Sequence, residues 1–447
     1  MGAETAAAET RAFRRSAGLL SAGVGASGLL TYGYFALASH QLDADSYGQI
    51  VVLWSAVFLA ISIFYRPVEQ LLSRTIAERR ALGAEIGSAL RVAATIQVGV
   101  AAGWAVLILA LRDPLQEDLL AGSEGLYWVL FGSVIVFGAS FFARGYLAGR
   151  RRFALLAALL VCESGTRTAF ALAVALGIAN GQLTIALGMV AAPCLSLLVV
   201  PLAFRRRIAD EPVGPPHGGG SVSLASGGRF ASAVLVVMLS EQVFLNSPPL
   251  LAGDDQTAGF IFNVLMVARA PLLVFQGVST SLLPHLTRIG ARGRAGEAAF
   301  RLSVTTTLRA VAAFTAVVLV VIAVAGPALM QAAFSDKFCY DRAGLLLVGA
   351  GMGLYLAATT LNQAALAQGR ARAAAARWGA CAVGFLAWSL LPWLEFERRI
   401  EIGFLAVAVV LTVSLAVLYR RSPEPGGVQP GSVEELEAQL ATADEAS

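Results

Sequence analysis

Long apolar runs separated by arginine-rich connections dominate this chain of 447 residues. Each run is close to the ~20 residues that an α-helix needs to cross ~30 Å of hydrocarbon. The 57% hydrophobic content and the mean hydropathy of +0.71 agree with that interpretation. The sequence therefore predicts an all-α polytopic membrane protein with about twelve transmembrane helices, at residues 17–39, 48–65, 92–111, 126–142, 153–179, 183–204, 230–251, 259–283, 310–329, 344–367, 378–394 and 402–419.

The charges predict which ends of the runs face the cytoplasm. Most of the 33 basic residues fall in every second connection, and Lys and Arg are enriched in cytoplasmic loops. The opposite connections are acidic, with Asp43, Asp45, Asp254 and Asp255 as examples. Both termini are therefore expected in the cytoplasm, and the first run is interpreted as an uncleaved span. The basic connections are 66–91, 144–152, 205–229, 288–309 and 370–377.

The longest polar connection divides six runs from six. The predicted organisation is a cytoplasmic N-terminal segment (1–16), a six-helix lobe (17–204), a cytoplasmic linker (205–229), a second six-helix lobe (230–421) and an acidic, mostly disordered cytoplasmic tail (422–447).

The two halves carry a weak internal repeat. Tyr47-Gly48 leads into a span that ends at Arg74, and Gly259 leads into one that ends at Arg288. The connection after each of these spans alternates arginines with apolar residues. It is either an amphipathic helix at the membrane surface or a solvated loop. Gly349-Ala-Gly-Met-Gly353 predicts close helix packing, with a hinge as the alternative.

Several functional classes are disfavoured by residue content. The chain has a single lysine, Lys337, so it lacks the Gly-Lys-Ser/Thr phosphate loop of ATP-driven pumps. The outer connections are too short for the sugar site of a membrane glycan polymerase or transferase, so we expect no enzyme. Scattered cysteines and histidines predict no metal or cofactor site. The net charge of +4 is attributed to contact with the inner leaflet, not with nucleic acid.

Four ionisable residues lie within the predicted spans: Glu163, Arg167, Glu241 and Arg269. Each would cost about 2.5–3.5 kcal/mol if it were unpaired at a helix centre, so pairing or hydration is required. Glu163 and Arg167 are spaced i,i+4 on one helix face. Glu241 lies in the run preceding that of Arg269, which shares a face with Gln276. These four ionisable residues form either structural ion pairs or the lining of a water-filled cavity for an anionic substrate or a coupling ion.

Taken together, the pattern resembles the Wzx-like polysaccharide-biosynthesis flippases of the multidrug/oligosaccharidyl-lipid/polysaccharide (MOP) superfamily. The six-plus-six spans, Leu42…Tyr47-Gly48, the segment Arg66-Pro-Val-Glu-Gln-Leu-Leu-Ser-Arg74 and its fainter echo before Arg288 carry the resemblance, over residues 10–421.

The resemblance implies two lobes that alternate access and carry an undecaprenyl-pyrophosphate-linked oligosaccharide from the inner to the outer leaflet of a bacterial cytoplasmic membrane. Arg167 and Arg269 match the intramembrane cations that engage the head group, with Arg66 at the cytoplasmic mouth. Membrane lipids and glycan-assembly enzymes are the implied partners, and the membrane potential, H⁺ or Na⁺ is the implied driving force.

The sequence also departs from part of this superfamily. Residues 17–39 lack the closely spaced arginines of the lipid II branch, which puts peptidoglycan-precursor transport in doubt. Cation-coupled multidrug exporters of the same superfamily share the topology, and Glu163 or Glu241 would then be the coupling carboxylate. The exporter is therefore the first alternative prediction, ahead of a membrane glycan polymerase or transferase.

Overall fold

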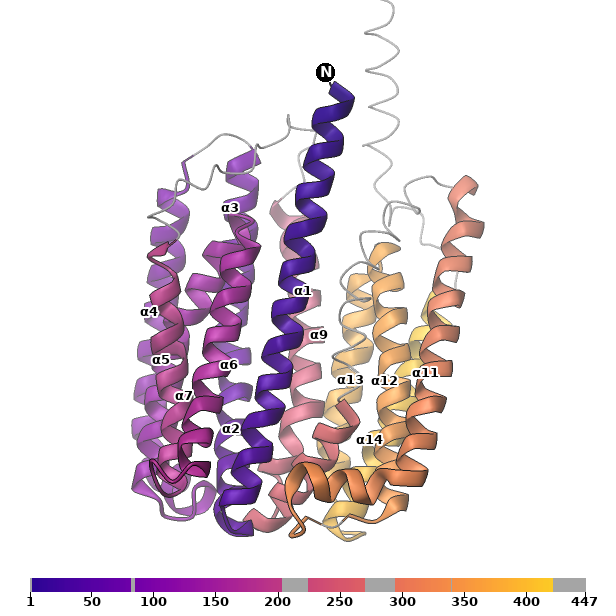
Figure 1. The fold of residues 1–447 in the computed structure, drawn as a ribbon. Coiled ribbons are helices and arrows are strands. Elements are labelled where there is room, and N and C mark those ends of the chain that lie inside the picture. Colours follow the sequence, from indigo (N-terminus) through magenta and orange to yellow (C-terminus); the bar gives the residue numbers. More distant parts are fainter. Residues whose placement is uncertain (1, 82–84, 203–223, 270–293, 339, 421–447) are drawn as a thin grey trace, which may run out of the picture. The chain divides into compact units, whose positions relative to one another are not determined.

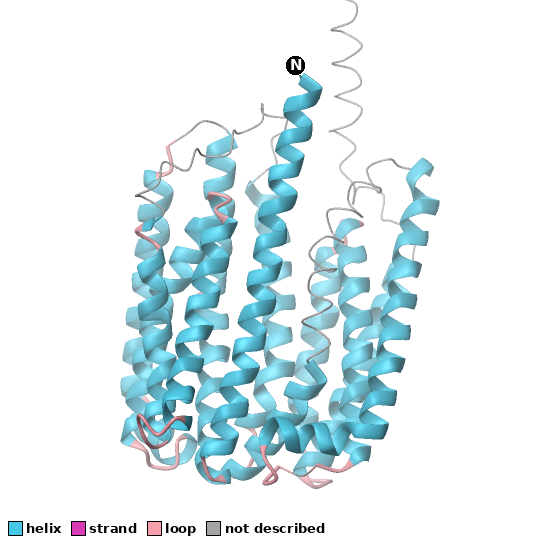
Figure 2. Cartoon of the chain, in the orientation of Figure 1, coloured by secondary structure: helices cyan, strands magenta, loops and turns pink. Residues whose placement is uncertain are grey.

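The computed structural model describes residues 2–81, 85–202, 224–269, 294–338 and 340–420. Throughout these residues the chain forms helices joined by short turns, as Figures 1 and 2 show. The helices are α1 (Gly2–Gln41), α2 (Ala44–Phe64), α3 (Arg66–Ala81), α4 (Gly87–Ala110), α5 (Glu124–Gly149), α6 (Phe153–Ala175), α7 (Gln182–Ser196), α9 (Leu224–Leu250), α11 (Arg294–Phe334), α12 (Arg342–Ala367), α13 (Ala371–Ser389) and α14 (Phe396–Arg420).

Three shorter elements complete this description. A π-helical turn covers Pro114–Leu119, a 3₁₀ turn covers Leu197–Val199, and residues 255–269 are helical up to the last described position of that segment. Most of the predicted interlobe linker 205–229, most of the predicted span 259–283 and the acidic tail lie outside the described residues, and residues 224–229 of the linker begin α9.

Nine helices in the described part of the chain are long and apolar enough to cross a membrane. They correspond to nine of the twelve predicted spans. The other three predicted spans fall in α1, in α13 and in the partly described helix 255–269. The all-helical membrane architecture is thus confirmed, whereas the sidedness of the termini stays a prediction.

The chain divides into two compact units. Unit 1 contains residues 1–213, 245–267 and 328–340, and unit 2 contains residues 214–244, 268–327 and 341–447. Boundaries between the units fall inside α9, helix 255–269 and α11. Two short segments from the second half of the sequence therefore pack with the first half. A division by contacts therefore differs from the predicted lobes 17–204 and 230–421, which follow chain order.

Glycines allow two helices of unit 1 to approach closely. A Cβ atom on Gly145 of α5 would lie 2.8 Å from the backbone oxygen of Glu69, and one on Gly149 would lie 2.8 Å from that of Ser73. At this spacing α3 packs directly against α5. A single residue, Tyr65, separates α3 from the end of α2.

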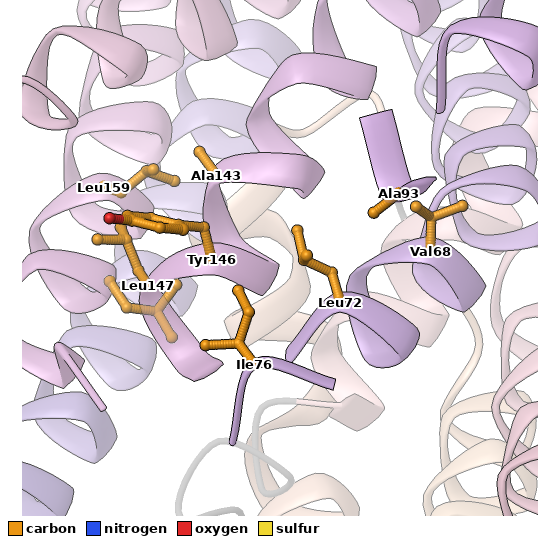
Figure 3. Close-up of a cluster of buried hydrophobic side chains, with 9 residues drawn as sticks. Val68, Leu72, Ile76, Ala93, Ala143, Tyr146, Leu147 and Leu159 are labelled. Atoms are coloured by element: carbon orange, nitrogen blue, oxygen red, sulfur yellow. The ribbon is translucent and has the colours of Figure 1, made fainter. Parts of the chain in front are cut away.

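The apolar side chains of α3 are covered by protein. Val68, Leu72 and Ile76 are at most 4% exposed and belong to one buried cluster with Tyr146 and Leu147 of α5. Figure 3 shows this cluster, with Val68 beside Ala93 of α4. The connection after the second span therefore contains the predicted amphipathic helix. Its apolar stripe faces α5 rather than the membrane surface, because the small residues at positions 145 and 149 admit it.

The repeated segments of the two halves contact each other within unit 1. A Cβ atom on Gly48 would overlap the backbone of Asp255, and one on Gly259 would lie 3.1 Å from the ring of Tyr47. The Tyr47 hydroxyl donates a hydrogen bond to the side-chain oxygen of Asn263, and both residues are fully buried. The glycine of each repeat is therefore needed for this contact.

Several acidic residues of the predicted outer connections cap helices. Asp43 accepts a hydrogen bond from the Ser46 backbone N–H at the start of α2. Asp254 accepts one from Thr257 at the start of helix 255–269, in the same geometry. Aspartate is favoured at such positions because its oxygen satisfies an N–H group with no partner inside the helix.

In unit 2, α12 packs along α11 and α14 through its glycines. A Cβ atom on Gly353 would overlap the Thr315 side chain of α11, and one on Gly349 would lie 2.9 Å from Ile322. On another face, Gly351 lies against Phe404 of α14. The predicted close packing of the Gly349–Gly353 motif is confirmed.

Candidate functional site

A buried ion pair on α6 is the centre of the candidate site. Arg167 Nη1 lies 3.3 Å from Glu163 Oε1, and the two residues are 4% and 3% exposed. They are one helical turn apart, so the predicted i,i+4 pair is present. The arginine also donates a hydrogen bond to the Ser164 hydroxyl, 3.2 Å away.

A second arginine binds the same carboxylate from another helix. Arg144 Nη2 of α5 lies 2.6 Å from Glu163 Oε2, and the Ser140 hydroxyl donates to that oxygen at 3.1 Å. The predicted connection 144–152 begins at Arg144, whereas α5 continues to Gly149. The side of the membrane on which Arg144 lies stays a prediction. The helix continues to Gly149 because Tyr146, Leu147 and the residues around them extend its buried face past Arg144.

Aromatic rings of α2 cover the guanidinium of Arg167. Its central carbon lies 5.0 Å from the centroid of the Trp54 ring and 5.6 Å from that of Phe58. These two rings stack on each other at 3.9 Å. A cation over an aromatic face is stabilised by the ring quadrupole, more strongly where water is excluded. The sequence contained no spacing signal for this contact, since α2 and α6 are far apart in the chain.

Two further charges of α3 extend the site. Arg66 is the first residue of α3, and Glu69 follows three residues later. Loss of hydration raises the pKa of Glu69, the positive charges of Arg144 and Arg66 oppose this rise, and the negative charge of Glu163 adds to it. We call Arg66, Glu69, Arg144, Glu163 and Arg167 the arginine cluster.

The arginine cluster contains three cations and two carboxylates, so it has a surplus of positive charge. The Nε–H groups of Arg66, Arg144 and Arg167 are buried and have no hydrogen-bond partner among the described residues. A buried donor without a partner costs free energy, and an anion with several oxygen acceptors would satisfy it. The cluster therefore pairs Glu163 with two arginines and has further N–H donors and positive charge to offer an anionic group.

The second predicted pair, Glu241 with Arg269, lies in unit 2. Glu241 is half-buried on α9, and Arg269 is the last described residue of its helix. The pairing between these two residues stays a prediction. Gln276 lies outside the described residues. On α12, Tyr355 and Asn362 are buried, and the Asn362 side-chain oxygen has no hydrogen-bond partner among the described residues.

No protein-family model and no curated protein matches this chain. Solved structures do resemble it. An inward-facing multidrug resistance MATE family transporter of the MOP superfamily has a TM-score of 0.67 and 13% identity, over 89% of this chain and 96% of that one. A MOP superfamily transporter from Pyrococcus furiosus has a TM-score of 0.60 and 13% identity, over 92% and 94%.

A variant of the Vibrio cholerae MATE transporter VcmN is also similar, with a TM-score of 0.59 and 15% identity, over 92% of this chain and 97% of that one. At identities this low, structural similarity establishes a common fold but does not identify the substrate. The chain therefore has the all-helical, membrane-embedded fold of the MATE transporters of the MOP superfamily.

Proposed function

We propose that this protein is a membrane transporter that moves an anionic lipid-linked oligosaccharide precursor from the inner to the outer leaflet by alternating access. The observation that carries this proposal is the arginine cluster, with its surplus of positive charge and its three buried Nε–H groups without partners. A pyrophosphate head group offers many acceptor oxygens to such donors. A cationic drug would meet repulsion there.

One structural neighbour sets a precedent for this reversal of charge. The Pyrococcus furiosus transporter is described as having a binding pocket of reverse polarity that suggests a different function. The surplus of arginine in our chain is consistent with the same kind of change, away from cationic substrates.

The membrane potential is the simplest driving force for this substrate. A head group with two negative charges would gain about 5 kcal/mol per 100 mV on moving outward across an inside-negative membrane. No bound cofactor is required by this proposal, and exchange with H⁺ or Na⁺ is an additional hypothesis. The proposed location is a bacterial cytoplasmic membrane, with glycan-assembly enzymes as partners.

The alternative is a cation-coupled multidrug exporter. It is favoured by the neighbours themselves, since the MATE transporter with a TM-score of 0.67 is a multidrug resistance protein. Its coupling carboxylate would be Glu163 or Glu241. Glu163 is less suited to this role in the state described, because two arginines hold its oxygens at 2.6 and 3.3 Å.

Deletion of the gene separates the two transporters. We expect loss of a surface glycan and accumulation of its lipid-linked precursor, with unchanged resistance to cationic drugs. Purified protein in proteoliposomes should also move a fluorescent pyrophosphate-linked saccharide between leaflets. Drug hypersensitivity with a normal surface glycan would instead support the exporter.

A further inference from the structure

A groove beside the first turns of α4 is separate from the arginine cluster. It has a volume of about 400 Å³ and is lined by Ser88, Arg91, Val92, Thr95 and Ile96. These residues recur every three or four positions, so they form one face of the helix. Further along α4 the groove is aliphatic, with Val92 59% exposed and Ile96 40% exposed.

The end of the groove near the N-terminus of α4 is basic. Arg91 is exposed, and its guanidinium makes no hydrogen bond or ion pair with any residue that the structure describes. Arg79 of α3 reaches the same rim, where it donates to the Ser88 hydroxyl at 2.5 Å and to the Glu85 backbone oxygen at 2.9 Å. No carboxylate is among the described residues that line the groove.

We propose that this groove binds an anionic phospholipid of the inner leaflet. The phosphodiester would accept hydrogen bonds from Arg91, with Arg79 adding positive charge, and an acyl chain would lie along Val92 and Ile96. The amphipathic lining supports this occupant. From Arg91 to Ile96 the helix descends about 7.5 Å, which takes the groove from head-group depth into the hydrocarbon. Arg79 and Arg91 belong to the basic connection 66–91, which the sequence predicts on the cytoplasmic side.

A fluorescent reporter beside the groove tests this binding. Gly99 lies one turn beyond Thr95 on the same exposed face, and a side chain there would meet no atom within 4 Å. Full-length protein with Gly99→Cys in a cysteine-free background would carry the fluorophore in phosphatidylcholine nanodiscs. Nitroxide-labelled phosphatidylglycerol should quench it at lower lipid fractions than nitroxide-labelled phosphatidylcholine. Equal quenching by the two lipids would overturn the proposal.

Substitutions show whether Arg91 is responsible. Arg91→Gln should lower the preference for phosphatidylglycerol about fivefold, which is the effect of one cation near a charged membrane surface, and Arg91→Lys should retain most of it. Arg151→Gln is the matched control, because Arg151 is another exposed arginine of the predicted cytoplasmic side, in the turn between α5 and α6. An equal loss in the control would mean that general surface charge, rather than this groove, selects the lipid.

Protein stability does not confound the test. Each variant should keep the wild-type unfolding temperature in detergent, since both arginines are exposed. If Arg91→Gln fails this criterion, the salt dependence of quenching in the wild-type protein replaces it: the preference should fall as salt screens the ionic contact. A preference that does not respond to salt would contradict the proposal.

Discussion

At the scale of single residues, the arginine cluster depends on Glu163. Its carboxylate binds the guanidinium groups of buried Arg167 and partly buried Arg144. Removing one partner from a buried charge network typically costs 3–5 kcal/mol, because the remaining charge stays buried. The glutamate therefore has a structural role in the described state whatever substrate the protein carries.

We predict that Glu163→Gln destabilises the protein by about 3 kcal/mol, since Arg144 and Arg167 would lose their shared counter-ion. The unfolding temperature of purified protein in detergent measures this. Adding Arg144→Gln should restore part of the loss, because one uncompensated cation is then removed. Asp118→Asn, at an exposed acid, should have little effect. An unchanged unfolding temperature in Glu163→Gln would contradict this account of the cluster.

Asp43 predicts a dependence of stability on pH. The hydrogen bond from Ser46 N–H lowers the pKa of this aspartate. The carboxylate cap therefore stabilises fully above the unfolded pKa of about 3.9, and its contribution is lost as the pH falls through the lower folded-state value.

Asp43→Ala should cost about 1 kcal/mol at neutral pH, and Asp43→Asn much less, since the amide oxygen still caps α2. Unfolding temperatures at pH 7 and pH 3 measure both. The Asn variant should lose less stability on acidification than wild type. Equal acid sensitivity in both proteins would show that Asp43 is not the titrating group.

At the scale of helices, α3 and α5 approach through Gly145 and Gly149. We predict that Gly145→Ala destabilises the protein by about 1–3 kcal/mol, because the added methyl meets the Glu69 backbone oxygen at 2.8 Å and α3 must move. Gly103→Ala on α4 is the matched control, since a methyl there meets no atom within 4 Å. It should be neutral or slightly stabilising, because alanine is the better helix former. Unfolding temperatures of both variants in detergent measure the difference in stability. A loss of similar size in Gly103→Ala would show that the contact between α3 and α5 is not the cause.

At the scale of the whole molecule, the single lysine tests the orientation in the membrane. Lys337 is exposed, and its amine donates a hydrogen bond to the Leu42 backbone oxygen at 2.8 Å, between two connections that the charge pattern places outside. An impermeant amine reagent should label it in intact cells, as peptide mass spectrometry would show. Lys337→Arg is the control and should abolish the label. Labelling only after the membrane is made permeable would reverse the predicted topology.

The two units show why a division by sequence differs from one by contacts. The charge pattern and the linker 205–229 predict six spans on each side, yet residues 245–267 and 328–340 pack with unit 1. Tyr47 with Asn263, and Lys337 with Leu42, are contacts of this kind. They join residues more than 200 positions apart, so no local pattern predicts them.

What the sequence alone determined is the set of helices and the pairing of Glu163 with Arg167, because hydrophobic length and the 3.6-residue period are local properties of a chain. Tertiary structure alone decided the rest of the cluster. Arg144 reaches Glu163 because α5 continues seven residues beyond the predicted end of its span and packs near α6. The covering of α3 by α5 has the same origin. Both contacts depend on partners distant in the sequence, and the approach of α3 also depends on Gly145 and Gly149 of α5.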